Sequence, residues 1–494
     1  MMSMKKYVII SILLGAFQVQ VLAQNPYDAL LFSRHYAGST ARSIAMGGAF
    51  GALGGDVSVL STNPAGLGVF RSSEFTFSPT VNISGTQANF ESITFSRRND
   101  TRFIFNNLGY VYNRNFNREK GLQTFNFGIA YNRLSDFNHS ARVSTPSASS
   151  SLLDEFVMYA NDGDWGEHYE GLAWETYAID FDDDEEIYFN DFMFEGYRYG
   201  ELSRRTNFRG GIGEYAFSVA FNFNHNLYVG ATLGIQDIQY GEAYNHVEIT
   251  PNDFEFLNSF TFREEYNVTG TGVNFKAGVL YRPIPLLRFG AAIHTPTYIW
   301  MQPDLYTVMY TFWNKSPAPE GGTSFMDDAR TDFSERYRLS TPWRYMMSAA
   351  AVIGTLGAVS TEIELVDFSQ NIILPEDDYL TDNSDISKDF KAAVNIKSGL
   401  EFRLGPVSFR GGFAFYGSPY HNNFSGEIND MLKGTMSYSG GIGFRRRGFS
   451  IDGAYSFTKH PDRAHFLYDY LYSHSYKLLQ VNAHKAILTL GFRF

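Results

Sequence analysis

The chain has 494 residues, no cysteine and a formal net charge of −12 at pH 7. The lack of cysteine excludes disulfides, thiolate catalysis and cysteine-bound metals, and the acidic balance argues against nucleic acid as a partner. Aromatic residues make up 17% of the chain, which is typical of membrane β-barrels with girdles of aromatic rings at both membrane surfaces.

The first residues predict a secretory signal peptide over 1–23. Two lysines precede an apolar run over 7–17, and Val21-Leu22-Ala23 is a cleavage site of small residues. That run is too short to span a bilayer. We therefore expect a mature chain that begins near Gln24.

Residues 24–72 show no alternating pattern, yet they are too apolar and too rich in glycine for a solvated tail. Small residues allow close approach of the backbone, and Asp56 or Ser58 can cap a short helix that must end before Pro64. A hatch, or plug, buried inside a barrel explains both features. The residues expected to form and control this hatch are Met46, Gly47, Gly48, Asn63, Pro64, Ala65 and Gly66.

Over residues 73–494, about fourteen segments alternate between apolar and polar residues with a period of two. Such segments are expected to be strands. Their ranges are 74–84, 103–113, 123–135, 213–223, 227–240, 266–282, 286–295, 343–353, 356–368, 391–403, 407–416, 435–446, 449–458 and 482–494.

The links between these segments are alternately short and long. An outer-membrane barrel has tight turns on the periplasmic side and long loops on the external side. An even number of strands that starts and ends in the periplasm produces this spacing, whereas a soluble sandwich has no reason to do so. The predicted fold class is all-β: a transmembrane antiparallel barrel of about 14 strands over 73–494, with an N-terminal hatch inside the lumen.

The last segment illustrates the two faces of the predicted wall. Leu488, Leu490 and Phe492 share one side, which suits lipid, and polar residues share the other, with Ile487 as an exception. A closed sheet of this kind satisfies every backbone amide in hydrocarbon. The polar face is therefore expected to line a lumen.

Three charged residues, Arg410, Asp452 and Arg493, are predicted to face this lumen. Asp452 and Arg493 lie near the periplasmic ends of neighbouring segments. The structural interpretation is an ion pair between them, or contacts with the hatch. The functional interpretation is a site for a carboxylate headgroup that uses Arg410 or Arg493.

The segment Asn63-Pro64-Ala65-Gly66-Leu67, together with Met46-Gly47-Gly48-Ala49, resembles the N-terminal signature of the outer-membrane long-chain fatty-acid and aromatic-hydrocarbon transporters (FadL/TodX/OmpP1 type). Residues 291–298 resemble the mid-barrel segment of that family. The resemblance implies a hatch that blocks the lumen, a hydrophobic ligand held beside it, and a sideways exit at a kinked third strand. Here the third strand carries Asn126, Gly128 and Asn132 on its inner face, and Gly128 permits either a kink or room for the plug.

Other chemistry has weaker support. The acidic runs within 180–186 and 376–385 lack the spacing of a calcium loop, so a solvated external surface is expected. His460, His465 and His474 could bind haem or could simply be exposed. Gly211-Ile212-Gly213 opens a strand and not a helix, so it is no dinucleotide motif. No nucleophile elbow, metalloprotease helix or P-loop occurs, and no enzyme activity, metal or cofactor is expected.

The leading hypothesis is passive uptake of small hydrophobic compounds, either long-chain fatty acids or aromatic hydrocarbons, through a hatch-gated channel in the bacterial outer membrane. The alternative is a non-transporting accessory or scaffold subunit of an outer-membrane assembly or secretion complex. The expected partners are a hydrophobic ligand, outer-membrane lipid and lipopolysaccharide, with other outer-membrane proteins in the scaffold case.

Overall fold

The computed structural model describes residues 26–494 except 37, 90–95, 149, 164, 194–198, 252–255, 320, 331–335, 422–432 and 467–475. The predicted signal peptide over 1–23 lies outside the described residues.

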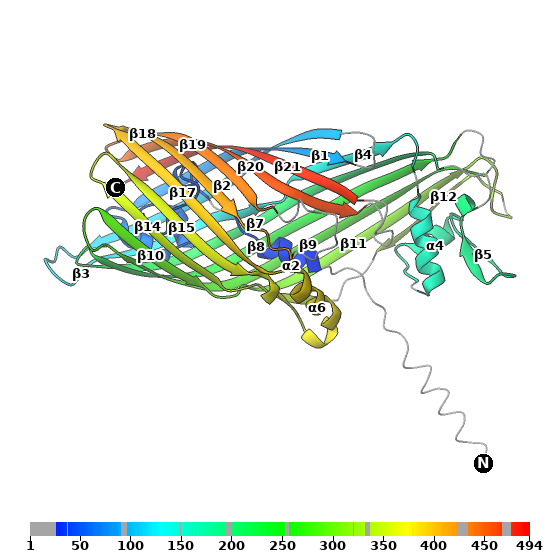
Figure 1. Ribbon diagram of the computed structural model, residues 1–494, viewed down its shortest axis with the longest axis horizontal. Coiled ribbons are helices and arrows are strands. Elements are labelled where there is room, and N and C mark those ends of the chain that lie inside the picture. Colours follow the sequence, from blue (N-terminus) through cyan, green and yellow to red (C-terminus); the bar gives the residue numbers. More distant parts are fainter. Residues whose placement is uncertain are drawn as a thin grey trace, which may run out of the picture.

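Fourteen antiparallel strands close into a barrel, as the alternation predicted. The first strand, β1 (Glu74–Asn89), pairs with both its successor and the last strand, β21 (Tyr476–Arg493), so the sheet has no edge there (Figure 1). The uninterrupted strands between them are β2 (Ser96–Asn115), β7 (Glu201–Phe223), β8 (Leu227–Ile249), β9 (Leu257–Tyr281), β17 (Ala392–Leu404), β18 (Val407–Tyr416), β19 (Thr435–Arg446) and β20 (Phe449–Phe466).

Four strands of the wall are broken into pieces. Each piece continues the line of the piece before it, because both pair with the same neighbouring strand, as β3 and β4 both do with β7. The pieces are β3 (Leu122–Asp136) with β4 (His139–Thr145), β10 (Leu287–His294) with β11 (Tyr298–Trp313), β12 (Ser324–Arg330) with β13 (Tyr337–Ser340) and β14 (Arg344–Ile353), and β15 (Gly357–Asp367) with β16 (Ile372–Leu374).

The two faces of the wall have the predicted chemistry. Phe409, Leu488 and Phe492 are exposed on the outside, where lipid would cover them. Ile487, the exception in the last strand, points inward and is buried against Ala41 and other apolar residues of the N-terminal helices. The exception therefore marks a contact with the N-terminal residues inside the lumen.

The strands on one side of the barrel are longer than predicted. β8 continues to Ile249 and β9 already begins at Leu257, so most of the expected long connection between them is strand. In the corresponding extension of β7, Arg205 and Arg209 occupy the outer face and are exposed. The outer face there is polar and meets water, so the apolar alternation that identified membrane strands is lost.

This extension carries a small external layer (Figure 1). Its helix α4 (Leu152–Asp162) begins with a capping box between Ser151 and Asp154 and buries Leu153 and Phe156 against Phe260. The remaining elements outside the barrel wall are α5 (Glu170–Glu175), β5 (Asp180–Asp182), β6 (Ile187–Phe189), η3 (Asp191–Met193), η4 (Phe368–Gln370), η5 (Glu376–Asp378) and α6 (Leu380–Asp389). No described helix is long and apolar enough to cross a bilayer.

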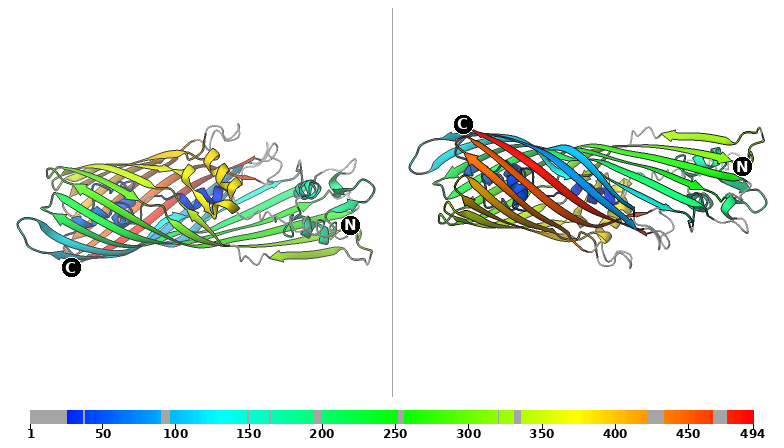
Figure 2. Two further views of the ribbon diagram at one scale, coloured as in Figure 1. Left: turned by 90° about the horizontal axis from the view of Figure 1, so that it is seen from below. Right: turned by 90° about the horizontal axis from the view of Figure 1, so that it is seen from above.

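Residues 26–72, called here the N-terminal segment, lie within the barrel. Four short helices make up the segment: α2 (Pro26–Ser33), α3 (Ala41–Ala45), η1 (Val57–Ser61) and η2 (Pro64–Val69). Figures 1 and 2 show its helices, drawn in dark blue, among the strands, with α2 beside α6 where the shorter strands end. Phe50, Leu60 and Leu67 form its own core and meet apolar residues of the wall.

Candidate functional site

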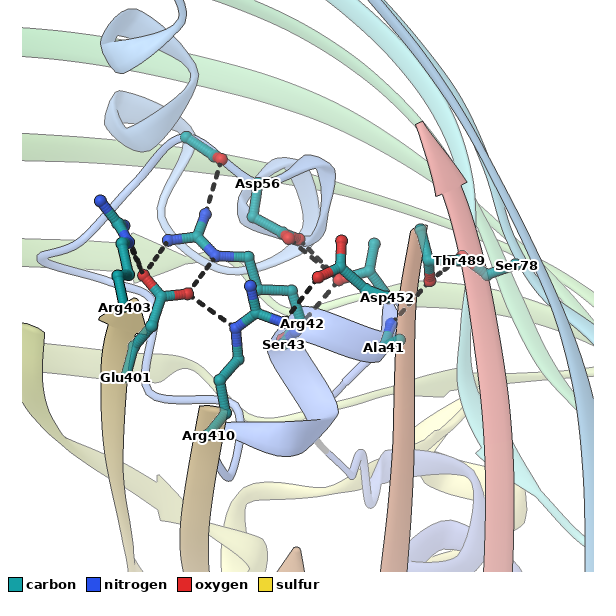
Figure 3. Close-up of polar contacts among 12 residues, drawn as sticks. Ala41, Arg42, Ser43, Asp56, Ser78, Glu401, Arg403, Arg410, Asp452 and Thr489 are labelled. Carbon is teal, nitrogen blue, oxygen red and sulfur yellow. Dashed lines mark hydrogen bonds and ion pairs between the residues drawn. The ribbon is translucent and has the colours of Figure 1, made fainter. Parts of the chain in front are cut away.

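An ion-pair network holds α3 against the wall. Arg42 Nε lies 3.0 Å from Glu401 Oε2, and the same carboxylate accepts from Arg410 Nε at 2.7 Å and from Arg403. Arg410 also pairs with Asp452 at 2.6 Å (Figure 3). These five residues are called the clamp. Arg42, Glu401, Arg410 and Asp452 are buried, so each charge depends on its partners.

Local sequence positions Arg42 for the clamp. Thr40 caps α3 by accepting from Ser43 N at 3.1 Å, and its hydroxyl donates to Asp56 at 2.9 Å. The first backbone amide of the helix, Ala41 N, donates to Thr489 Oγ1 at 2.7 Å in β21. The helix is therefore fixed at its start, and its second residue projects toward β17.

The expected pairing of Asp452 with Arg493 is wrong. Arg493 Nε pairs with Glu74 at 2.7 Å, whereas Asp452 pairs with Arg410. The strand register places Asp452 opposite Thr489, which leaves Arg493 about 13 Å further along the strand. All three predicted lumenal charges thus have ion-pair partners on the wall.

Glycines on the inner face of the wall form close contacts with the N-terminal segment. A Cβ on Gly399 would lie 2.4 Å from Met46 O, and one on Gly412 would lie 2.1 Å from Gly47 N, so no side chain fits. Gly47 and Gly48 themselves adopt φ of 63° and 80° where α3 ends. The same kind of contact recurs around the wall at Gly109, Gly128, Gly230, Gly278, Gly290 and Gly441.

The residues of the predicted hatch motif make specific contacts. Asn63 Nδ2 donates to Gly51 O at 2.8 Å and to Val279 O at 3.2 Å, and its Oδ1 accepts from Ala65 N. Gly66 N donates to Asn63 O at 2.9 Å. The backbone of Pro64 lies against the inner wall, 2.4 Å from where a Cβ of Gly230 would be. This motif therefore joins the segment internally and fixes it to β8 and β9.

The three inner-face residues of the third strand also contact the N-terminal segment. Asn126 Nδ2 donates to Leu67 O at 2.9 Å, and Asn132 Nδ2 donates to Ser61 Oγ at 2.8 Å. A Cβ on Gly128 would lie 2.9 Å from Leu60. Gly128 is paired on both sides without a break, so this glycine makes room for the segment and the strand is not kinked there.

The wall is interrupted higher in the same strand. The ladder between β2 and β3 stops at Asn107 opposite Asn132, although both strands continue. Beyond it the register of β3 shifts next to Leu134, a β-bulge that bends the strand. Leu134 O then accepts from Tyr36 N at 3.0 Å. At the bulge, where the ladder to β2 has already ended, the N-terminal segment therefore supplies a hydrogen-bond partner for β3.

This interruption faces the surroundings of the barrel. At its level β2 presents Phe103 and Phe105 outward, with 64% and 53% of their surface exposed. On the inner side, Asn106 Nδ2 donates to Gly38 O at 3.1 Å. Just beyond the interruption, Asn82 and Ser84 of β1 donate to Asp136 and Asn138 O, and Ser140 of β4 donates to Asp100 of β2. The gap in the ladder between β2 and β3 is therefore short, and it lies between an apolar outer surface and the N-terminal segment.

A cavity of about 120 Å³ lies beside the gap. Its wall combines apolar and aromatic side chains with charged ones and includes both the displaced part of β3 and the N-terminal segment. Tyr36 packs edge-on against Tyr416 and His460, with ring centroids 5.1 Å apart in each pair. Other lining residues are Arg34, Leu134, Phe137 and Lys485.

A second cavity of about 60 Å³ also borders the N-terminal segment and shares Tyr36, Gly38, Arg133 and Leu134 with the larger one. Its cations are matched by carboxylates: Lys276 pairs with Glu214, Arg344 pairs with Glu364 at 3.0 Å, and Lys397 contacts both Glu364 and Glu362. His294 contacts Thr62 O at 2.6 Å. These pairs link neighbouring strands and neutralise the charges that face this cavity.

Sequence reasoning missed Arg42, Glu401 and the inner-face glycines. An arginine in the run of small residues over 41–52 was a usable signal, because a buried arginine requires an acidic partner. Of the predicted haem ligands, His460 lines the larger cavity, His474 lies outside the described residues and the side chain of His465 is not described. No cluster of three metal-binding side chains occurs in the described part of the chain.

No protein-family model and no curated protein sequence matches the chain. Solved structures do resemble it. A Pseudomonas aeruginosa FadL homologue shares 12% identity over 93% of this chain and 100% of its own, with a TM-score of 0.54. The Pseudomonas putida toluene transporter TodX shares 11% identity over 93% of this chain and 99% of its own, with a TM-score of 0.51. The Ralstonia pickettii toluene transporter TbuX shares 14% identity over 94% of this chain and 100% of its own, with a TM-score of 0.50. The chain therefore has the FadL-type fold that its N-terminal motifs predicted.

Proposed function

We propose that this protein is a passive channel through which small hydrophobic compounds cross the outer membrane of a bacterium. One observation carries the proposal: the N-terminal segment packs inside the barrel, while in the described part of the chain the backbone ladder between β2 and β3 ends at Asn107 and Asn132. Under this proposal the segment blocks passage straight through the barrel, and the compound leaves sideways where the ladder ends. Transfer of apolar surface out of water, about 25 cal/mol per Å², drives entry without a cofactor.

The proposed path starts at the external end of the barrel and reaches the larger cavity. From there the compound passes between β2 and β3 into the membrane, at the level of Phe103 and Phe105. The N-terminal segment acts as the hatch, with Met46, Gly47, Gly48 and the Asn63-Pro64-Ala65-Gly66 motif holding its floor in place. The floor stays in the barrel during uptake, because the clamp and the glycine contacts surround it.

The helix α2 is the movable part of this hatch. Its Ala29, Leu30 and Phe32 are buried in an apolar cluster that includes residues of β8, β9 and β11. A hydrophobic compound can replace such contacts, since apolar packing is not directional. Displacement of α2 would open the route from outside to the cavity.

Two of the similar structures are toluene transporters, which supports a small hydrophobic ligand for this chain. Long-chain fatty acids are the second ligand class under the proposal, and lipid and lipopolysaccharide would surround the exposed apolar wall. No described feature favours the accessory or scaffold role over transport, so that role is treated as an outcome of the test.

The test is uptake by whole cells whose own channel of this fold has been deleted, since lipopolysaccharide then limits entry. Cells that make this protein should take up labelled toluene or oleate faster than cells with an empty vector. If cells with the protein take up neither compound faster than cells with the empty vector, the proposal is contradicted. Equal rates together with stoichiometric co-purification of other membrane proteins would indicate the scaffold role.

A further inference from the structure

The larger cavity differs from the smaller one in its charge balance. The lysines and arginines named in the smaller cavity all have a carboxylate partner. In the larger cavity, Asp136 is paired with Arg133 at 3.6 Å and accepts from Asn82 at 2.8 Å. Among the described residues, Arg34 and Lys485 form no ion pair in that cavity, although both line it.

The strand register directs Lys485 into the cavity. It lies between Asn82 of β1 and Ser456 of β20, which are both buried on the inner face and both line the same cavity. Asp136, the acid that lines the same cavity, is paired with Arg133 at 3.6 Å. Among the described residues, the lysine amine therefore has no carboxylate partner of its own.

The second cation belongs to the N-terminal segment. The Arg34 guanidinium carbon lies 5.7 Å from the centre of the Tyr36 ring, and Arg34 O accepts from Ser135 Oγ at 2.7 Å. These contacts hold the arginine backbone at the bulge of the third strand. Two cations from different parts of the chain thus line one cavity beside its aromatic wall.

The size of the cavity limits what these cations can bind. Its volume of about 120 Å³ approaches the roughly 150 Å³ that is sufficient for benzene in an apolar cavity. The rings of Tyr36, Tyr416 and His460 offer faces and edges for aromatic packing. A single aromatic ring suits this space better than a long alkyl chain does.

We infer that the larger cavity is a binding site for small aromatic carboxylates, with Lys485 and Arg34 binding the carboxylate and the Tyr36 side of the cavity packing on the ring. This inference rests on the proposed function and assigns its ligand class. Charge-assisted hydrogen bonds to a carboxylate are about twice as strong as neutral ones. The anion should therefore bind more tightly than a neutral molecule of the same shape.

The experiment compares benzoate with benzamide by calorimetric titration of the full-length protein in detergent. The wild-type protein should bind benzoate at least tenfold more tightly. Lys485→Met and Arg34→Met should each weaken benzoate binding by about tenfold, consistent with the loss of a charged hydrogen bond, and should leave benzamide binding unchanged. Lys485→Arg should keep most of the preference, and unchanged benzamide binding by Lys485→Met would show that its loss of benzoate affinity is not a folding defect.

Lys388→Met is the matched control, because Lys388 lies on α6 and its side chain is 68% exposed. It should change neither affinity. Equal affinity of the wild-type protein for benzoate and benzamide, or unchanged benzoate affinity in both cavity variants, would overturn the inference. If cells still take up toluene or oleate in that case, the proposed channel stands; if uptake is also absent, both proposals fail.

Discussion

The two halves of the N-terminal segment are held in different ways. Residues 40–69 are fixed to the wall by the clamp, by the contacts of Asn63 and by inner-face glycines. Residues 26–36 form no ion pair in the described structure. They are held by apolar packing of α2 and by hydrogen bonds to β3, from Tyr266 to Asp28 and from Arg344 to Ser33 O. Directional contacts between buried charges resist exchange, whereas apolar contacts can be replaced by a ligand. Under the proposed function, one short segment therefore provides both a fixed floor and a displaceable lid.

The largest expected effect comes from removing the centre of the clamp. Glu401→Ala leaves Arg42, Arg403 and Arg410 close together without their shared carboxylate, which should cost about 3–5 kcal/mol of stability. The floor should loosen, and ion conductance through the protein in planar bilayers should rise. Urea unfolding and single-channel recording would measure the two effects.

Glu265→Ala is the control for the clamp variant. Glu265 pairs with Arg263, whose side chain is 53% exposed, and exposed pairs contribute at most about 1 kcal/mol. A conductance increase of similar size in both variants would show that the clamp has no special role in closing the lumen.

A smaller effect is expected where the wall meets the floor. Gly412→Ala places a methyl group where Gly47 N would be 2.1 Å away, and such overpacking typically costs about 1–3 kcal/mol. Gly411→Ala is the matched control, because a Cβ there meets nothing within 4 Å. Urea unfolding should show a loss for Gly412→Ala alone. Equal stability of both variants would contradict the close packing of the floor.

The lid should respond to pH through Asp28. Burial raises the pKa of Asp28 from 3.8 to about 7, against the opposing effect of the hydrogen bond from the Tyr266 hydroxyl. Docked α2 thus holds a proton that a released helix gives up. Its docking is favoured most below pH 3.8 and weakens as the pH rises through about 7.

Hydrogen exchange within α2 should therefore be about tenfold faster at pH 8.5 than at pH 5.5, after correction for the intrinsic effect of pH, whereas residues 40–69 should not change. Asp28→Asn should remove this dependence, because the amide stays neutral. A pH response that persists in Asp28→Asn, or one that is equally large in the floor, would contradict the division of the segment.

The smallest effect is expected in the external layer, which belongs to neither half. Ser151→Ala removes the cap of α4 and should cost about 1 kcal/mol. Proteolysis near α4 should become faster while toluene uptake stays the same. A fall in uptake would show that the external layer takes part in transport.

The sequence predicted the barrel because lipid on one side and a polar lumen on the other impose a strict alternation, as in residues 449–458 and 482–494. It did not predict the extensions of β7 to β9, because Arg205 and Arg209 face water and break that alternation. It paired Asp452 with Arg493 because single-strand patterns give the face of a residue and not its register. Gly128 shows a similar limit: a strand glycine permits a kink, but only the opposing Leu60 reveals why it is needed.

The most direct test of the account is to lock the floor and measure uptake. The chain has no cysteine, so Asn63→Cys with Gly278→Cys introduces a single pair, at positions where a Cβ on Gly278 would lie 3.0 Å from Asn63 Cγ. Cells with the oxidised double variant should take up toluene or oleate as fast as cells with the reduced form, since the compound is proposed to leave sideways between β2 and β3. The opposite result would be uptake by the double variant that stops on oxidation and returns on reduction, while oxidation does not change uptake by either single variant.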